Sequence, residues 1–135
     1  MGLLFAPFTM ILSDSVIIPY SIILLPERIF ALCTSLTNVV LPQNLTRIGY
    51  AAFYNCKSLI RITIPKSVKS IEERAFEKCS YLSSITVKPE TPPTGGEYMF
   101  ANTNIAPIYV PSGSVDSYKS AEYWRNYASR IQPIQ

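Results

Sequence analysis

Three cysteines are the side chains best suited to chemistry in this chain of 135 residues, because the chain contains no histidine. A thiolate can act as a nucleophile, often activated by a histidine, or it can bind a metal, often together with histidine ligands. The absence of histidine excludes serine and cysteine triads built on it, and it removes the commonest general base. The cysteine count is odd and no Cys-x-x-Cys pair occurs, which argues against a disulfide framework or a zinc site. We therefore expect no catalytic residue, no cofactor and no metal.

Charged residues are the other candidates for a functional site. Glu72, Glu73 and Glu77 could form an acid/base pair, but nothing in the sequence indicates that they are buried, and motifs for phosphate binding or hydrolysis are absent. The net charge of +3 is spread along the chain, which argues against a nucleic-acid groove. Six basic residues lie close to these glutamates: Lys57, Arg61, Lys66, Lys69, Arg74 and Lys78. A patch for heparin-like or phosphate ligands is one interpretation, and a solvated, charge-balanced face is the favoured one.

The spacing of the cysteines reveals how the chain is organised. Cys33, Cys56 and Cys79 are equally spaced with a period of 23, and equal spacing at such a period indicates a repeat array. Other positions coincide at the same period, among them Leu36, Leu59 and Leu82; Val39, Ile62 and Ile85; and Phe53 with Phe76. The repeated unit reads L-x-x-I-x-I-P-x-x-V-x-x-I-x-x-x-A-F-x-x-C. The thiols could form a reactive row, but three buried residues in one slot of stacked coils is the favoured interpretation.

Each segment of the unit predicts a local structure. Ile62-Thr63-Ile64 alternates as a half-buried strand does, and the proline after it ends the strand. Residues 68–71 predict a second short extended segment, and residues 72–79 about one helical turn. One unit cannot bury its own apolar face, so units must stack. We predict a β-rich α/β repeat solenoid of four to five coils with a parallel sheet, in which Phe53 and Phe76 are core residues.

The unit resembles the BspA-like (Treponema-type) leucine-rich repeat, and its ending is seen at residues 52–56 and 75–79. The resemblance covers about residues 13 to 135. It implies a right-handed leucine-rich-repeat solenoid, found mostly in secreted or surface-attached bacterial proteins, with an adhesin-like role and no catalytic residues. We therefore expect an extracellular or cell-surface location, although no secretion signal or lipid-attachment cysteine is recognised near the start.

The two ends are expected to differ from the repeats. Residues 1–12 predict a ragged part of an earlier coil, residues 13–104 the repeats, and residues 105–135 a closing strand and a C-terminal cap helix, all in one domain. Residues 89–96 predict a turn-rich loop. Ser114 is the expected N-cap of the cap helix, with Asp116 in its first turn. The aromatic residues near this end predict a packed cap or, alternatively, a platform for a sugar or peptide; they are Tyr109, Tyr118, Tyr123, Trp124 and Tyr127.

The outward face of the predicted sheet is the expected binding face, because side chains there point outward from every coil. Its two columns supply the candidate residues: Asn38, Arg61 and Ser84 in one, and Val40, Thr63, Thr86 and Tyr109 in the other. The alternative is an ordinary strand surface. We expect a protein or glycan ligand, no nucleic acid and no membrane span. The chain could also be a structural spacer that associates with itself, including as a homodimer through an uncapped N-terminal end.

Overall fold

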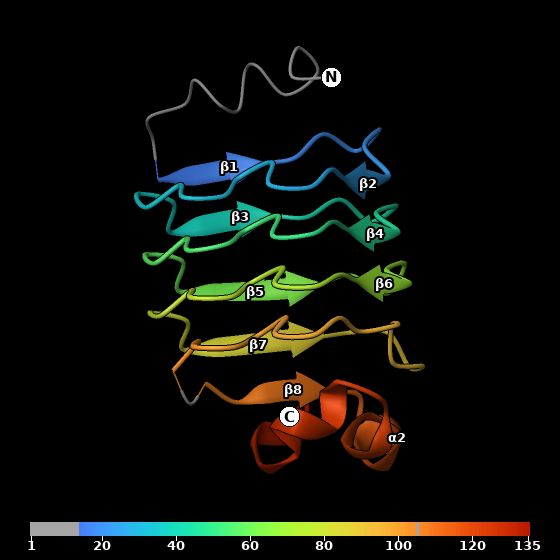
Figure 1. Cartoon of the computed structure of the whole chain (residues 1–135). Helices are drawn as coiled ribbons and strands as arrows, with labels where there is room; N and C mark the ends of the chain where they lie inside the picture. Colours follow the sequence, from blue (N-terminus) through green and yellow to red (C-terminus); the bar gives the residue numbers. More distant parts are fainter. Residues whose placement is uncertain (1–13, 105) are drawn as a thin grey trace.

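The computed structural model describes residues 14–104 and 106–135, and it shows a stack of short coils with β1 and the C-terminal residues at opposite ends (Figure 1). The predicted partial coil at residues 1–12 lies outside the described residues. The main strands run one above another along the stack: β1 (Ser15–Ile17), β3 (Asn38–Val40), β5 (Arg61–Ile64), β7 (Ser84–Val87), β8 (Ile108–Val110) and β9 (Ile131–Pro133). A second, shorter stack contains β2 (Leu24–Leu25), β4 (Arg47–Ile48) and β6 (Ser70–Ile71). The predicted repeat solenoid is confirmed.

Strand pairing follows the period of the sequence. All pairs are parallel, and the residue numbers of the partners differ by one period, from Ser15 with Asn38 to Ile108 with Ile131. Strand β1 pairs with β3, and β5, β7, β8 and β9 form a four-stranded sheet, but β3 and β5 do not pair within the described chain. The sequence analysis predicts a single closing strand, which corresponds to β8, whereas the structure has a further strand, β9, after the cap.

Equivalent side chains form continuous columns in the core. Every member of one column is at most 5% exposed: Val16, Val39, Ile62, Ile85, Ile108 and Ile131. The rings of Phe30, Phe53, Phe76 and Phe100 are stacked, with centroids 5.4, 5.0 and 5.5 Å apart. Such close offset packing of large apolar groups supplies much of the burial that a single coil cannot provide. The expected core role of Phe53 and Phe76 is confirmed.

The predicted helical turn at residues 72–79 is wrong. Arg74 and Lys78 have φ angles of 61° and 65°, in the left-handed region, and the segment is a series of turns. The amides of Arg74, Phe76 and Lys78 donate to carbonyls of the next coil, at 2.8 to 2.9 Å. The intervening amide of Glu77 donates to the Arg74 carbonyl within the same coil. Alternating backbone directions therefore build another ladder between coils, and an α-helix could not make these bonds.

The fourth coil has one extra residue after β7 that is made up again before β8, because Ile85 pairs with Ile108 at a separation of 23. Ile64 pairs with Val87 at a separation of 23, whereas the bridge between Ser70 and Thr94 has a separation of 24. The extra residue lies in the expected turn-rich loop, where this coil has an isolated bridge in place of a two-residue strand. Phe100 is shifted by the same residue and still stacks on Phe76.

A cap packs on the last coil through η1 (Ser112–Ser114), α2 (Val115–Ser120) and η2 (Trp124–Arg130). Tyr118 and Trp124 are fully buried, and the Trp124 ring contacts Phe100 with centroids 5.8 Å apart. Both therefore belong to a packed cap and are not part of a surface platform. Ser114 is the N-cap residue of α2, as expected, but its hydroxyl makes no capping hydrogen bond and donates instead to the Glu90 carbonyl at 2.7 Å. Asp116 does lie in the first turn of α2.

Candidate binding face

The sheet brings the predicted site residues onto one face. Parallel pairing places Arg61 beside Ser84 and Thr63 beside Thr86, and Thr86 beside Tyr109. Their neighbours in each strand alternate into the core, so these side chains point outward. Asn38 and Val40 of β3 are exposed in the same alternation. Both predicted columns are therefore present on the outward face.

The interruption between β3 and β5 coincides with a hollow in this face. The hollow has a volume of about 240 Å³, and the residues that line it are Asn38, Val39, Val40, Leu41, Gln43, Arg61, Thr63, Pro65 and Lys88. Its walls combine apolar side chains with two amides and two cations. Such a mixture of apolar surface and few convergent polar groups is typical of recognition sites.

A second hollow lies at the other end of the face. Thr86, Tyr109, Ile134 and Gln135 line a volume of about 250 Å³. Val40 is 47% exposed and Ile134 is 38% exposed, so apolar surface is present near both hollows. The face thus offers two separate contact points connected by the threonine column.

The cysteines take no part in this face. The thiols of Cys56 and Cys79 are buried and donate to the carbonyls of Phe30 and Phe53, both at 3.1 Å. A hydrogen bond with Cys79 and burial raise the pKa of Cys56. A raised pKa reduces the thiolate fraction, so Cys56 is a poor nucleophile. The interpretation of buried residues in one slot is confirmed for Cys56 and Cys79, whereas Cys33 is partly exposed.

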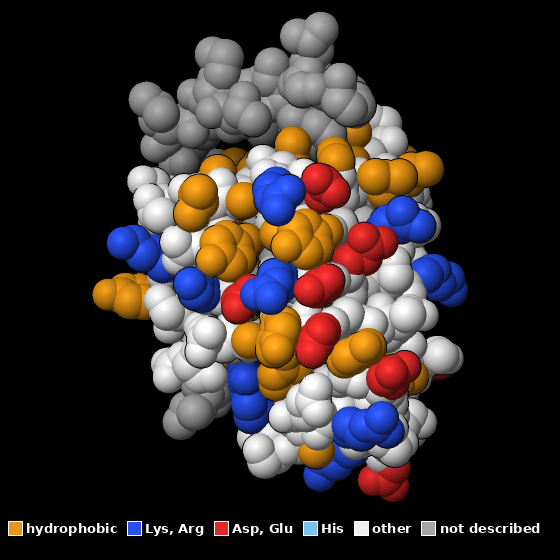
Figure 2. Space-filling model, viewed as in Figure 1, with side chains coloured by type: hydrophobic (Ala, Val, Ile, Leu, Met, Phe, Trp, Pro, Cys, Tyr) orange, Lys and Arg blue, Asp and Glu red, His pale blue; other side chains and the backbone are white. Residues whose placement is uncertain are grey.

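The side of the molecule formed by the turn segments has balanced charges. Arg74 lies 2.8 Å from Glu77 and 3.5 Å from Glu73, and Arg47 lies 3.2 Å from Glu72. Figure 2 shows basic, acidic and hydrophobic side chains intermingled along the middle of the view in which the turn segments cross in front. Contrary to expectation, one of these glutamates is buried. Glu77 is only 7% exposed, and its carboxylate forms the ion pair with Arg74. Each of the three carboxylates therefore lies in an ion pair with an arginine.

Cation–π contacts reinforce the turn side. The guanidinium of Arg28 lies 4.9 Å from the centre of the Tyr50 ring, and that of Arg74 lies 4.8 Å from Tyr98. These contacts join side chains of successive coils and have a structural role. The charge-balanced face predicted for the third unit is correct for Arg74 and wrong for Arg61, Lys66 and Lys69, which lie elsewhere without a carboxylate partner among the described residues.

Neither a metal-ligand cluster nor a helix able to cross a membrane is found in residues 14–104 and 106–135. The two hollows on the sheet face were not predicted. The sequence shows which side chains point outward, but the break between β3 and β5 leaves no signal in the strand pattern, which is equally regular on both sides of it. Strand β9 could have been found, since Ile131 follows Ile108 at the same period as the other strand positions.

Comparisons with known proteins agree with the geometry. The model of the BspA type leucine rich repeat region matches residues 8–127 in six copies. A search of curated proteins finds no match. A solved structure of a leucine-rich repeat protein from Bacteroides ovatus is similar, with a TM-score of 0.69 and 28% sequence identity. The match covers 90% of this chain and 30% of the Bacteroides protein, so this chain corresponds to less than a third of that protein.

Proposed function

Because the chain belongs to the BspA-type leucine-rich-repeat family, we propose that it is a non-enzymatic module that binds a protein through the outward face of its sheet. The observation that carries this proposal is that residues of the two outward columns line two hollows. Asn38, Val40, Arg61 and Thr63 line one hollow, and Thr86 and Tyr109 line the other. An extended row of side chains from successive coils is the usual binding surface of a solenoid. We further propose, from the family, an extracellular or cell-surface location and an adhesin-like role.

Two aspects of the face favour a protein ligand over a glycan. Exposed aliphatic side chains occur at Ile17, 71% exposed, and at Val40, 47% exposed. Apolar side chains of a partner gain free energy by covering such surface, at about 25 cal/mol per Å². The polar residues between them can fix the register of the partner.

The proposal can be tested with a random peptide library displayed on phage and selected on the immobilised protein. We expect the selected peptides to lose at least about tenfold in affinity for a Thr63→Gln/Thr86→Gln variant, since two longer uncharged side chains then cover the threonine column. Tyr109→Ala should weaken those peptides that reach the second hollow. Affinities are measured by fluorescence anisotropy.

The matched control is Thr34→Gln/Ser80→Gln, which introduces the same side chains at exposed positions away from the strands. This variant should bind the selected peptides as the wild type does. If no peptide discriminates between the two double variants, the sheet face does not bind, and a structural spacer that associates only with itself is favoured.

A further inference from the structure

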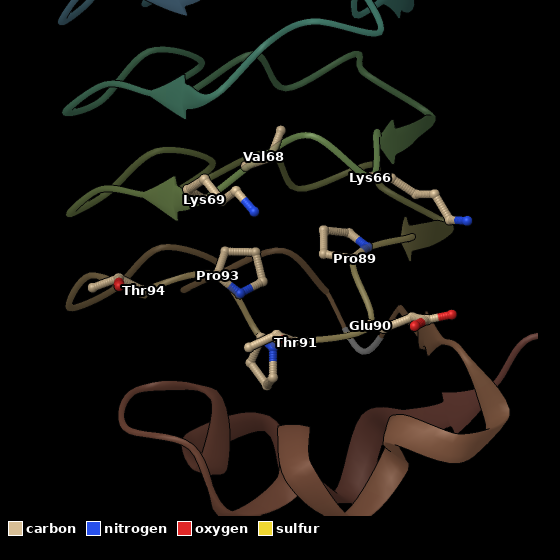
Figure 3. Close-up of a pocket in the computed structure, with 9 residues that line it drawn as sticks. Lys66, Val68, Lys69, Pro89, Glu90, Thr91, Pro93 and Thr94 are labelled. Atoms are coloured by element: carbon tan, nitrogen blue, oxygen red, sulfur yellow. The ribbon is translucent and has the colours of Figure 1, made fainter.

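A larger hollow lies beyond the end of the sheet strands, where the third and fourth coils separate. It has a volume of about 620 Å³ between the segment containing Lys66, Val68 and Lys69 and the loop of residues 89–94 (Figure 3). The fourth coil has its extra residue here, and three of the six loop residues are prolines, which have no amide hydrogen to donate to the coil above. The two segments therefore face each other without a ladder until Thr94 donates to the Lys69 carbonyl at 2.9 Å.

The lower wall of this hollow is held by the cap. The hydroxyl of Tyr118 donates to the carbonyl of Pro89 at 2.6 Å, and the indole of Trp124 donates to the carbonyl of Pro93 at 2.8 Å. Both donors are fully buried. These two hydrogen bonds attach the loop to the cap, so the loop has a defined shape in the absence of a ligand. A preformed site loses less conformational entropy on binding.

Four cations surround this hollow and the hollow between β3 and β5. We name this set the basic ridge: Arg61, Lys66, Lys69 and Lys88. The two hollows adjoin, because Pro65 and Lys88 line one of them and their chain neighbours Lys66 and Pro89 line the other. All four cations are exposed, and none forms an ion pair with another described residue.

The charge of the basic ridge is almost uncompensated. Glu90 is the one acidic residue lining either hollow, against four cations. On the turn side, in contrast, the glutamates pair with Arg47 and Arg74. The fold therefore places charged residues that are close in the sequence on two different surfaces. One surface has balanced charges, and the other is positively charged. A surface of this kind attracts an anionic partner and orients it during encounter.

Apolar groups lie between these cations. Val39, Val40, Leu41 and Pro65 line one hollow, and Val68, Pro89, Pro92 and Pro93 line the other. A sulfated polysaccharide has no apolar side chains that could fill such spaces. An acidic peptide that also carries aliphatic residues can place its carboxylates over the cations and its aliphatic side chains in the hollows.

We propose that the basic ridge and its two hollows bind an extended acidic peptide segment of a partner protein, with aliphatic side chains entering the hollows. This inference rests on the proposed function and specifies the chemistry of the partner. It extends the binding surface from the sheet face across the bend after β5 and β7, where the sequence analysis considered Lys66 and Lys69 as part of a larger charged patch.

The test uses a synthetic peptide of alternating glutamate and leucine or valine residues, with fluorescence anisotropy at low and moderate salt. We expect Lys66→Gln/Lys69→Gln/Lys88→Gln to weaken binding about tenfold, and added salt to weaken binding to the wild type. The control Lys57→Gln/Lys119→Gln/Arg125→Gln removes the same charge at other exposed positions and should change affinity less than about twofold. A second peptide with serine at the aliphatic positions should bind at least about fivefold more weakly.

Three results would overturn the inference. The two triple variants could bind equally, the serine peptide could bind as tightly as the aliphatic one, or dextran sulfate could bind more tightly than the peptide through the same lysines. If phage-selected peptides depend on Thr63 and Thr86 but neither contain acidic residues nor respond to the lysine variants, the proposed function stands and this inference fails. If no peptide binds in either experiment, both fail.

Discussion

At the scale of single residues, the fold depends on slots that recur from coil to coil. The phenylalanine and cysteine slots are visible in the sequence at Phe53, Phe76, Cys56 and Cys79, because the third coil repeats the second without insertion. The fourth coil hides the same slot. Thr103 lies one position beyond a full period after Cys79, is fully buried, and donates its hydroxyl hydrogen to the Phe100 carbonyl at 2.8 Å. A change of residue type combined with a shift of one position removes the signal that spacing alone provides.

The buried thiol of Cys56 predicts a loss of stability at alkaline pH. Its pKa is raised in the folded protein above the ordinary value of 9.0, so the thiol keeps its proton when the unfolded chain has lost it. Its contribution is therefore complete below pH 9 and decreases as the pH rises further. We expect Cys56→Ala to be less stable than the wild type at pH 7, and this difference to shrink by about 1.4 kcal/mol at pH 10.

Urea unfolding of both proteins at pH 7, 8, 9 and 10 measures this difference. Tyr118, whose pKa is also raised by burial, remains in both proteins and so contributes equally to their alkaline loss. A difference in the free energy of unfolding that does not change with pH would show that Cys56 ionises as readily in the folded chain as in the unfolded one.

At the scale of elements, the strands were predictable and the turn segments were not. Alternation in residues 61–64 and 84–87 identifies β5 and β7 directly. The turn segments have apolar residues at spacings that also suit a helix, while equivalent positions in successive coils have positive φ: Arg28, Ala51, Arg74 and Tyr98. None of these four is glycine or asparagine, so local composition gives no warning. The left-handed conformation costs about 1–2 kcal/mol per residue, and the hydrogen bonds to the next coil offset this cost.

The close approach of successive coils predicts that any side chain at Gly96 destabilises the fold. A Cβ atom at this position would lie 2.3 Å from the backbone nitrogen of Glu73 and 2.5 Å from the carbonyl carbon of Glu72. Because the obstacle is backbone, the coils must move apart, and we expect Gly96→Ala to lower the free energy of unfolding by about 1–3 kcal/mol. Gly113→Ala is the control, since a Cβ there has no neighbour within 4 Å and should change stability by less than about 0.5 kcal/mol. Equal stability of the two variants in urea would contradict the described contact between the third and fourth coils.

At the scale of the whole molecule, the fold separates charges that the sequence mixes. Positions such as Lys69 and Glu72 are close along the chain, yet Lys69 lies at the hollow beside the prolines, and Glu72 pairs with Arg47 of the coil above. The candidate columns could be predicted because strand alternation fixes which way each side chain points. One hollow depends on the absent pairing between β3 and β5, and another on the extra residue in the loop after β7. Neither feature can be recognised from the pattern of neighbouring residues in the sequence.

The outer edge of β9 presents few backbone amides to which a further strand could bind. The amide of Ile134 donates to the carbonyl of Val110, on the side of β9 that faces β8. Because backbone groups alternate along a strand, those of Ile131 and Pro133 face the opposite side, which is the outer edge of the sheet. The amide of Ile131 is occupied by the Ala128 carbonyl, and Pro133 has none. This edge therefore presents no free amide from either residue to a further strand, which protects the sheet from extending by pairing with other chains.

Duplication of one coil tests the central claim, that coils stack with every slot on its counterpart because their strands recur every 23 residues. A copy of residues 36–58 inserted after residue 58 preserves the register, whereas a copy of residues 36–55 at the same place is three residues shorter than the 23-residue period. We expect the first variant to unfold cooperatively in urea, with a free energy of unfolding at least equal to that of the wild type and a larger m value, because the added coil buries further surface. The second should be clearly destabilised. Equal stability of the two insertions would contradict the account, since stacking would then not depend on the period.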